Sequence, residues 1–229
     1  DTPDLTADVA KVPVQVQTEL RRATELARSG SYQAAYDIYD GVIVLYPDLL
    51  PALLGQINTL FEMGALTENQ QDRLSLLIEK LQARLPGSGV ATYVESRKIY
   101  QSGNASAALE LARVASERAP ALYQTRLWYG KLLMDNGRFL QAANEFKTVV
   151  SLSGGDVPAA YENLAELYHR SGQLDSCAAV VEYALSQYPV NVKLLLLQGR
   201  LPASNNIRKI HIPVRVKYGS SVWNRRNRL

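Results

Sequence analysis

The chain has 229 residues, of which 47% are hydrophobic and 21% charged, so it is long enough to fold around a buried core. Its formal net charge is +3, and its single cysteine, Cys177, excludes a framework of internal disulfides. No apolar run approaches the roughly 20 residues that a membrane-spanning helix needs.

Residues 1–14 are predicted to form an N-terminal extension, and a pair of helices follows it. The first helix is indicated by apolar and small residues at helical spacing, at Leu20, Ala23, Leu26 and Ala27. The stretch GSYQAAYDIYDGVIVLYP, from Gly30 to Pro47, has the same spacing and predicts the second helix. Pro47 ends this helix because proline cannot continue its backbone hydrogen bonds.

The same pattern recurs along the chain. Turns that contain glycine occur in RSGSY, EMGAL, QSGNA, DNGRF and RSGQL, with the glycines at 30, 64, 103, 137 and 172. The intervals between these glycines are 34, 39, 34 and 35 residues. Prolines close several units, at Pro47, Pro86, Pro120 and Pro189. A period of about 34 residues with a turn inside each unit indicates stacked helix pairs.

This pattern resembles the tetratricopeptide-repeat family. The family places a small residue early in the second helix of each pair, and this sequence has Ala35, Ala108, Ala142 and Cys177 there. The resemblance implies an all-α fold, a right-handed superhelical solenoid of about five helix pairs over residues 15–201. Residues 191–201 are expected to form the first part of a sixth, capping helix. The repeat at about residues 50–85 carries a five-residue insertion and is predicted to be degenerate, with a longer second helix.

The resemblance also implies a groove for a protein client, lined by the first helix of each pair. The predicted client contacts are Tyr93, Arg97, Tyr100, Leu127, Lys131, Met134, Glu162 and His169. The second repeat offers Leu54, Asn58 and Phe61 at the same places, and the fifth also offers Glu166. Aromatic side chains together with arginine are typical of binding hot spots. The alternative for each residue is an ordinary packing or solvated role.

Two functional classes are disfavoured. Chaperone-binding members of the family hold a C-terminal carboxylate with Lys and Asn, but the matching places here are Leu20 with Thr24 and Leu54 with Asn58. An enzyme is disfavoured because there are only two histidines and no cluster with metal-ligand spacing. We therefore predict no catalytic residue, no metal and no cofactor, and a packing role for Cys177.

The C-terminal segment, residues 202–229, differs in composition from the rest of the chain. It holds seven basic side chains and no acidic one, and Arg208, Lys209, Arg215 and Lys217 are the candidate contact residues. Between 209 and 218, apolar residues alternate strictly with polar ones or proline, which predicts a short basic strand-like tail. Its interpretations are an arm that packs on the solenoid or on a partner's sheet, a basic arm for nucleic acid or anionic lipid, the first strand of a membrane β-barrel, or an engineered remnant.

The favoured interpretation is a non-catalytic scaffold that binds a client protein in bacterial envelope assembly or export. Bacterial outer-membrane exporters of polysaccharides and surface lipoproteins join a periplasmic tetratricopeptide domain to a β-barrel, and this chain is similar in layout. The alternative is therefore such a periplasmic domain, and a lesser one is binding of nucleic acid or anionic lipid through the tail. The expected location is the bacterial periplasm beside the outer membrane, with the cytoplasm as the other option. The chain starts at Asp1 rather than Met, which removal of a signal peptide would explain, and so would an engineered boundary.

Overall fold

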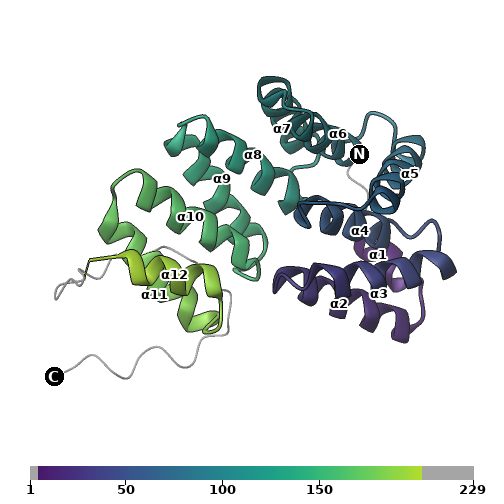
Figure 1. Ribbon diagram of the computed structural model, residues 1–229, viewed down its shortest axis with the longest axis horizontal. Coiled ribbons are helices and arrows are strands. Elements are labelled where there is room, and N and C mark those ends of the chain that lie inside the picture. The colour runs from purple at the N-terminus through teal and green to yellow at the C-terminus, as the bar shows by residue number, and fades with distance from the viewer. Residues whose placement is uncertain (1–4, 203–229) are drawn as a thin grey trace. The chain divides into compact units, whose positions relative to one another are not determined.

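The structure, a computed structural model, describes residues 5–202, and in this range it consists of twelve α-helices without a strand (Figure 1). A short helix, α1 (Leu5–Ala10), lies in the N-terminal extension. Five helix pairs follow: α2 (Val14–Arg28) and α3 (Tyr32–Leu45), α4 (Leu50–Glu62) and α5 (Glu68–Arg84), α6 (Gly89–Gln101) and α7 (Ala105–Arg118), α8 (Tyr123–Asp135) and α9 (Phe139–Leu152), α10 (Pro158–Arg170) and α11 (Leu174–Gln187). A single helix, α12 (Val192–Arg200), ends the described part.

The all-α prediction of about five helix pairs is confirmed in the described part of the chain. The chain divides within α9, between Glu145 and Phe146, into two compact units. The first unit contains α1 to α8, and the second contains α10 to α12. The predicted strand-like tail lies outside the described residues, and so do Arg208, Lys209, Arg215 and Lys217. Within residues 5–202, no helix combines the length and apolar character needed to cross a membrane.

Each of the five glycines that mark the period lies in the turn between the two helices of a pair and has a positive φ. Gly103 illustrates the reason. It follows α6 with φ of 89°, and its amide donates to the carbonyl of Tyr100 at 3.0 Å. Asn104 then begins α7 by accepting a hydrogen bond from the amide of Ala107 at 3.1 Å. Only glycine adopts this left-handed conformation at little cost, so it allows so tight a reversal between helices.

The second pair accommodates its insertion in two places. The loop between α4 and α5 spans residues 63–67, two residues more than the corresponding loops of the other pairs, and α5 has 17 residues where α3, α7, α9 and α11 have 14. A reciprocal capping box fixes the start of α5: Thr67 accepts from the amide of Gln70, and the Gln70 side chain accepts from the amide of Thr67. The prediction of a longer second helix is therefore confirmed.

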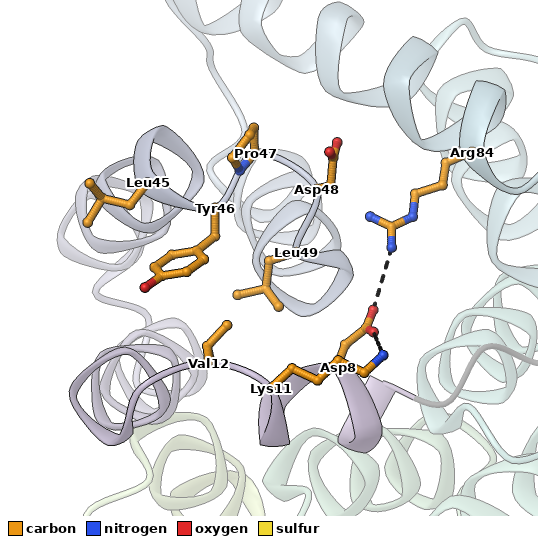
Figure 2. A pocket seen from close by; sticks show the side chains of 9 residues that line it. All are labelled: Asp8, Lys11, Val12, Leu45, Tyr46, Pro47, Asp48, Leu49 and Arg84. Atoms are coloured by element: carbon orange, nitrogen blue, oxygen red, sulfur yellow. Dashed lines mark hydrogen bonds and ion pairs between the residues drawn. The ribbon is translucent and has the colours of Figure 1, made fainter.

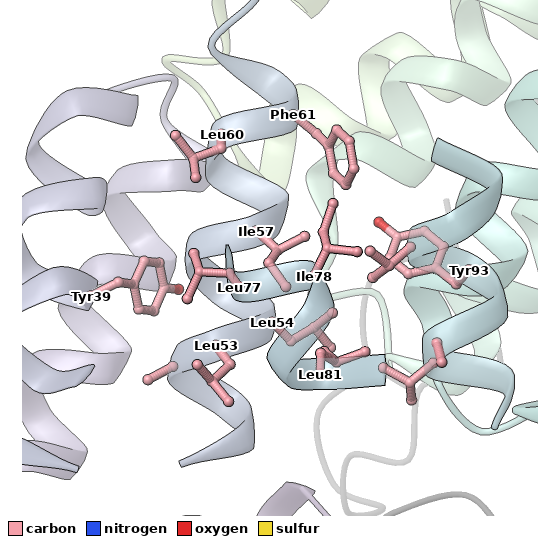
Figure 3. Packing of buried hydrophobic residues seen from close by; sticks show 14 of the residues in the cluster. Tyr39, Leu53, Leu54, Ile57, Leu60, Phe61, Leu77, Ile78, Leu81 and Tyr93 are labelled. Carbon is pink, nitrogen blue, oxygen red and sulfur yellow. The ribbon is translucent and has the colours of Figure 1, made fainter. Parts of the chain in front are cut away.

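The core of the first unit is built where successive helices pack. Figure 3 shows side chains from α3, α4, α5 and α6 meeting in one buried cluster, among them Tyr39, Leu53, Ile57, Leu77 and Tyr93. Small side chains let paired helices approach closely. Ala108 in α7 is fully buried, and its carbonyl accepts a 2.7 Å hydrogen bond from the buried Ser96 hydroxyl in α6. This bond ties the two helices of the third pair together.

The second unit repeats this construction. Cys177 in α11 and Ala165 in α10 are both fully buried, as expected for the small positions of a helix pair. Tyr188, after α11, donates a 2.6 Å hydrogen bond to the carbonyl of Gly155 in the loop before α10. Its ring lies 6.4 Å from the ring of the buried Tyr161. The loop before α10 is thereby fixed to the end of α11.

Candidate functional site

Three first helices of the first unit, α4, α6 and α8, share a cluster of aromatic and charged side chains around Arg97. We call it the Arg97 cluster and define it by its members: Asn58, Phe61, Glu62, Tyr93, Ser96, Arg97, Tyr100, Trp128 and Lys131. Its members come from the helices that the sequence predicts to line a binding surface. The cluster is the densest combination of ring and charge contacts that the described part of the chain offers.

Arg97 has a partner for both terminal nitrogens of its guanidinium. Its Nη2 donates to Glu62 Oε1 at 2.6 Å, and its Nη1 donates to the Tyr93 hydroxyl at 3.2 Å. The Tyr93 hydroxyl in turn donates to Asn58 Oδ1 at 2.7 Å. Since Asn58 and Glu62 lie one turn apart on α4, these bonds hold α6 against α4 at two successive turns of the helix.

Aromatic rings from the helices on either side of α6 also contact Arg97. Its guanidinium carbon lies 4.6 Å from the centre of the Phe61 ring of α4 and 4.8 Å from that of the Trp128 ring of α8. A guanidinium over an aromatic ring is attracted to the negative face of the ring, and the attraction grows when water is excluded. Arg97 is only 8% exposed, so it acts as an internal connection between three successive repeats.

Trp128 links this buried connection to the surface. Its indole Nε1 donates to Ser96 Oγ at 2.9 Å, the same hydroxyl that bonds Ala108. The Tyr100 ring meets the Trp128 ring edge-on, with the centres 5.2 Å apart and the planes at 89°. Lys131 Nζ lies 5.8 Å from the centre of the Trp128 ring. Trp128 therefore fixes the positions of both Tyr100 and Lys131.

Burial and neighbouring groups together shift the pKa values of Tyr93 and Arg97. Burial raises the pKa of Tyr93 above its ordinary value, although the nearby Arg97 opposes this shift. Burial opposes the charge of Arg97, but Tyr93 and Glu62 outweigh it, so the pKa of Arg97 lies above its ordinary value. Arg97 therefore stays charged and Tyr93 stays neutral across the physiological pH range. The charge of Arg97 is matched by Glu62.

The predicted contact residues of the first unit fall into two groups. Tyr93, Arg97 and Met134 are buried, and Leu127 is half-buried. Tyr100 is 36% exposed and Lys131 is half-buried, so these two reach solvent. In the described part of the chain Lys131 forms no ion pair, whereas Arg97 does. The accessible part of the cluster therefore offers an aromatic edge and a positive charge.

The remaining predicted contacts, Glu162 and His169, belong to α10 in the second unit. Glu162 is held by the residues that begin α12: Asn191 Nδ2 donates to its Oε1 at 2.7 Å, and Lys193 Nζ lies 3.1 Å from its Oε2. His169 is half-buried in the last turn of α10. Glu162 thus fixes the α10–α12 packing, and contact of either residue with a client stays a prediction.

Sequence reasoning passed over Trp128, Glu62 and Ser96. It carried over only residues that occupy equivalent places in successive repeats, and Trp128 follows such a place, Leu127, by one residue. Neighbouring first helices, however, meet through side chains about one turn apart. Arg97 and Lys131 occupy equivalent places, and Trp128 lies three residues, about one helical turn, before Lys131. Glu62, which pairs with Arg97, likewise lies one turn from the equivalent place Asn58. A search for aromatics one turn from the equivalent place would have found Trp128.

A pocket of about 290 Å³ lies apart from this cluster, beside α1 (Figure 2). Its lining residues are Asp8, Lys11, Val12, Leu45, Tyr46, Pro47, Asp48, Leu49 and Arg84. Asp8 forms ion pairs with Lys11 at 3.1 Å and with Arg84 at 3.8 Å, so the charges drawn in Figure 2 partly neutralise each other. Among residues 5–202, no group of three or more His, Cys, Asp or Glu side chains is arranged to hold a metal ion.

Comparisons with known proteins give similar folds. No protein-family model matches the sequence, and no curated protein matches it. A solved structure of TTC0263, a thermophilic TPR protein in Thermus thermophilus, matches with a TM-score of 0.60 and 24% identity over 80% of this chain and 97% of that one. YrrB, a TPR protein with an unusual peptide-binding site, matches with a TM-score of 0.50 and 17% identity over 79% of this chain and 90% of that one. The chain therefore has the tetratricopeptide-repeat fold that its sequence resembles.

Proposed function

We propose that this protein is a non-catalytic interaction scaffold that binds an extended segment of a client protein at the accessible edge of the Arg97 cluster. The observation that carries the proposal is the arrangement of Trp128, Tyr100 and Lys131 on a rigid support. Ser96 and Arg97 hold Trp128 in place, and Trp128 contacts Tyr100 and Lys131, which both reach solvent. Among residues 5–202, Lys131 has no ion-pair partner. A preordered aromatic edge beside a positive charge reduces the entropy lost on binding.

The chemistry of the site indicates the kind of segment that fits. An apolar or aromatic side chain of the client would pack on Tyr100, and a carboxylate or backbone carbonyl would accept from Lys131. A fold shared with a neighbour described as having a peptide-binding site supports a peptide segment as the client in general terms. A function in bacterial envelope assembly or export, a periplasmic location and the exporter alternative rest on the similarity in layout, a helical solenoid followed by strand-like residues, and they stay proposals.

Site-specific photocrosslinking in cells tests the scaffold proposal. One probe replaces Tyr100, and a control probe replaces Leu174, which is 38% exposed against 36% for Tyr100. We expect a discrete protein crosslinked at Tyr100, absent at Leu174 and lost when Lys131→Glu is added. The same bands at both positions, or a crosslink at Tyr100 that is indifferent to Lys131→Glu, would contradict the proposed site.

A further inference from the structure

A polar junction connects α3, α4 and α5 in the first unit. The carboxylate of Asp40, on α3, receives both of its bonds on one oxygen. Asp40 Oδ1 accepts a 2.7 Å hydrogen bond from Arg73 Nη2 of α5 and a 3.0 Å bond from Gln56 Nε2 of α4. Gln56 is fully buried, which is unusual for so polar a side chain. We call Asp40, Gln56 and Arg73 the Asp40 junction.

Two atoms of the Asp40 junction are buried without a partner. In the described part of the chain, neither Gln56 Oε1 nor Arg73 Nε has a hydrogen-bond partner. The Gln56 amide cannot turn around to find one, because only its Nε2 can donate to the Asp40 carboxylate. A buried polar group without a partner bears the full cost of leaving water, and nearly all such groups in native proteins are therefore hydrogen-bonded. The junction thus calls for one further hydrogen-bonding group.

We propose that the Asp40 junction is a binding site for an ordered internal water, which donates to Gln56 Oε1 and accepts from Arg73 Nε. The two unpartnered atoms have opposite character, since one accepts and the other donates. A cation would suit Gln56 Oε1 but would face the charge of Arg73, and an anion would suit Arg73 but would face the Gln56 oxygen and Asp40. Water donates and accepts at once, so it matches both atoms.

The geometry brings the two atoms towards one place. Gln56 Oε1 shares a carbon with the nitrogen that contacts Asp40, and Arg73 Nε shares a carbon with the other contacting nitrogen. One water bridges atoms up to about 6 Å apart, because each of its hydrogen bonds spans about 3 Å. The side chains of Asp40 and Arg73 are 40% and 25% exposed, so water can enter from the surface beside them. The water completes a link among three helices, two of which form the repeat with the insertion.

A crystal structure of the full chain, at a resolution that shows ordered water, tests the proposal. We expect a water within hydrogen-bond distance of both Gln56 Oε1 and Arg73 Nε. Thr59, one turn further along α4, is the control: it is 1% exposed, but its hydroxyl already donates to the Gly55 carbonyl at 2.8 Å, so we expect no water there. A protein group bonded to Gln56 Oε1, an ion at the junction, or no water at either atom would overturn the proposal.

A pair of variants and a solution measurement sharpen the test. Gln56→Met keeps a side chain of similar length but removes the amide oxygen, and we expect the water to be lost from its crystal structure. Thr59→Val changes a buried polar side chain outside the junction and should keep the water. In solution, NMR cross-relaxation between water and the Arg73 Nε proton should be present in the parent and in Thr59→Val, and lost in Gln56→Met. A signal that is absent in the parent, or that persists in Gln56→Met with its helical circular dichroism intact, would contradict the site.

Discussion

At the scale of single residues, Arg97 and Trp128 have different roles in the cluster: Arg97 connects the helices, and Trp128 positions the side chains that reach solvent. Arg97 connects α4, α6 and α8 through one ion pair, one hydrogen bond and two ring contacts. Trp128 makes one of those ring contacts with Arg97, and its own ring contacts Tyr100 and Lys131, so it holds these two side chains in place. A client that binds at the surface therefore meets side chains whose positions are set by a buried arginine.

Substitutions of Trp128 separate its ring from its indole donor. Trp128→Phe keeps a ring beside Arg97 and Tyr100 but loses the bond to Ser96, and we expect a loss of about 1 kcal/mol in the free energy of unfolding. Trp128→Ala also removes a buried ring, so the expected loss is about 3–5 kcal/mol. Urea unfolding followed by circular dichroism measures both. Equal losses in the two variants would show that the ring contacts of Trp128 contribute nothing to the free energy of unfolding.

Cys177 gives a pH-dependent prediction. Burial, with Glu166 as a smaller cause, raises the pKa of its thiol to about 11, above the ordinary 9.0. The folded state thus favours the neutral thiol, and the stability that this contributes is present below the ordinary pKa and is lost as the pH rises towards 11. At pH 8 the thiolate fraction is about a hundredfold lower than for a free cysteine.

Thiol labelling under native conditions checks this prediction. We expect Cys177 to resist a thiol reagent at pH 8 until denaturant is added. The control is Leu174→Cys in a Cys177→Ser background, which puts an exposed thiol three residues earlier on the same helix. Rapid native labelling of Cys177, at the rate of this control, would contradict its burial.

At the scale of the elements, two glycines show how closely helices approach. Gly89, the first residue of α6, lies so near α7 that an added Cβ would stand 2.6 Å from the Ala119 Cβ and 2.7 Å from the Ala119 backbone nitrogen. Gly41, inside α3, has nothing within 4 Å of an added Cβ. The same substitution should therefore have opposite effects at the two positions.

We expect Gly89→Ala to lower the free energy of unfolding by about 1–3 kcal/mol, because the Ala119 backbone cannot move aside freely. Gly41→Ala should raise it by about 0.5–1 kcal/mol, because alanine loses less conformational freedom in a helix than glycine does. Both free energies come from urea unfolding of the full chain. A stabilising Gly89→Ala would mean that α6 and α7 pack less closely than described.

At the scale of the whole molecule, the sequence predicts the repeat architecture well because the repeat has strong local markers. Gly103 and its counterparts occupy turns that need a positive φ, and Ala108 and Cys177 occupy the buried small positions. The insertion in the second repeat could also be predicted, because Gly64 and Gly103 are 39 residues apart whereas the other turn glycines are 34 or 35 apart.

The contacts of the candidate site were less predictable. Tyr93 and Arg97 were correctly placed on first helices, but their burial depends on Phe61 and Trp128, which belong to the neighbouring repeats. Glu162 was expected at a binding surface, and its pairing with Asn191 and Lys193 depends on where α12 packs. A single repeat's sequence does not reveal which side chains its neighbours bring to the interface, because that requires the packing between repeats.

The most direct test of the scaffold account is the affinity of the client captured at Tyr100, measured by titration calorimetry with the full chain. We predict that Tyr100→Ala with Lys131→Glu weakens binding by about tenfold to a hundredfold, equal to about 1.4–2.8 kcal/mol, without a change in the melting temperature of more than a few degrees. The matched control, Lys98→Glu, makes the same charge change at an exposed position of α6 and should bind as the parent does. An unchanged affinity in the double variant would contradict the assignment of the Arg97 cluster as the client site.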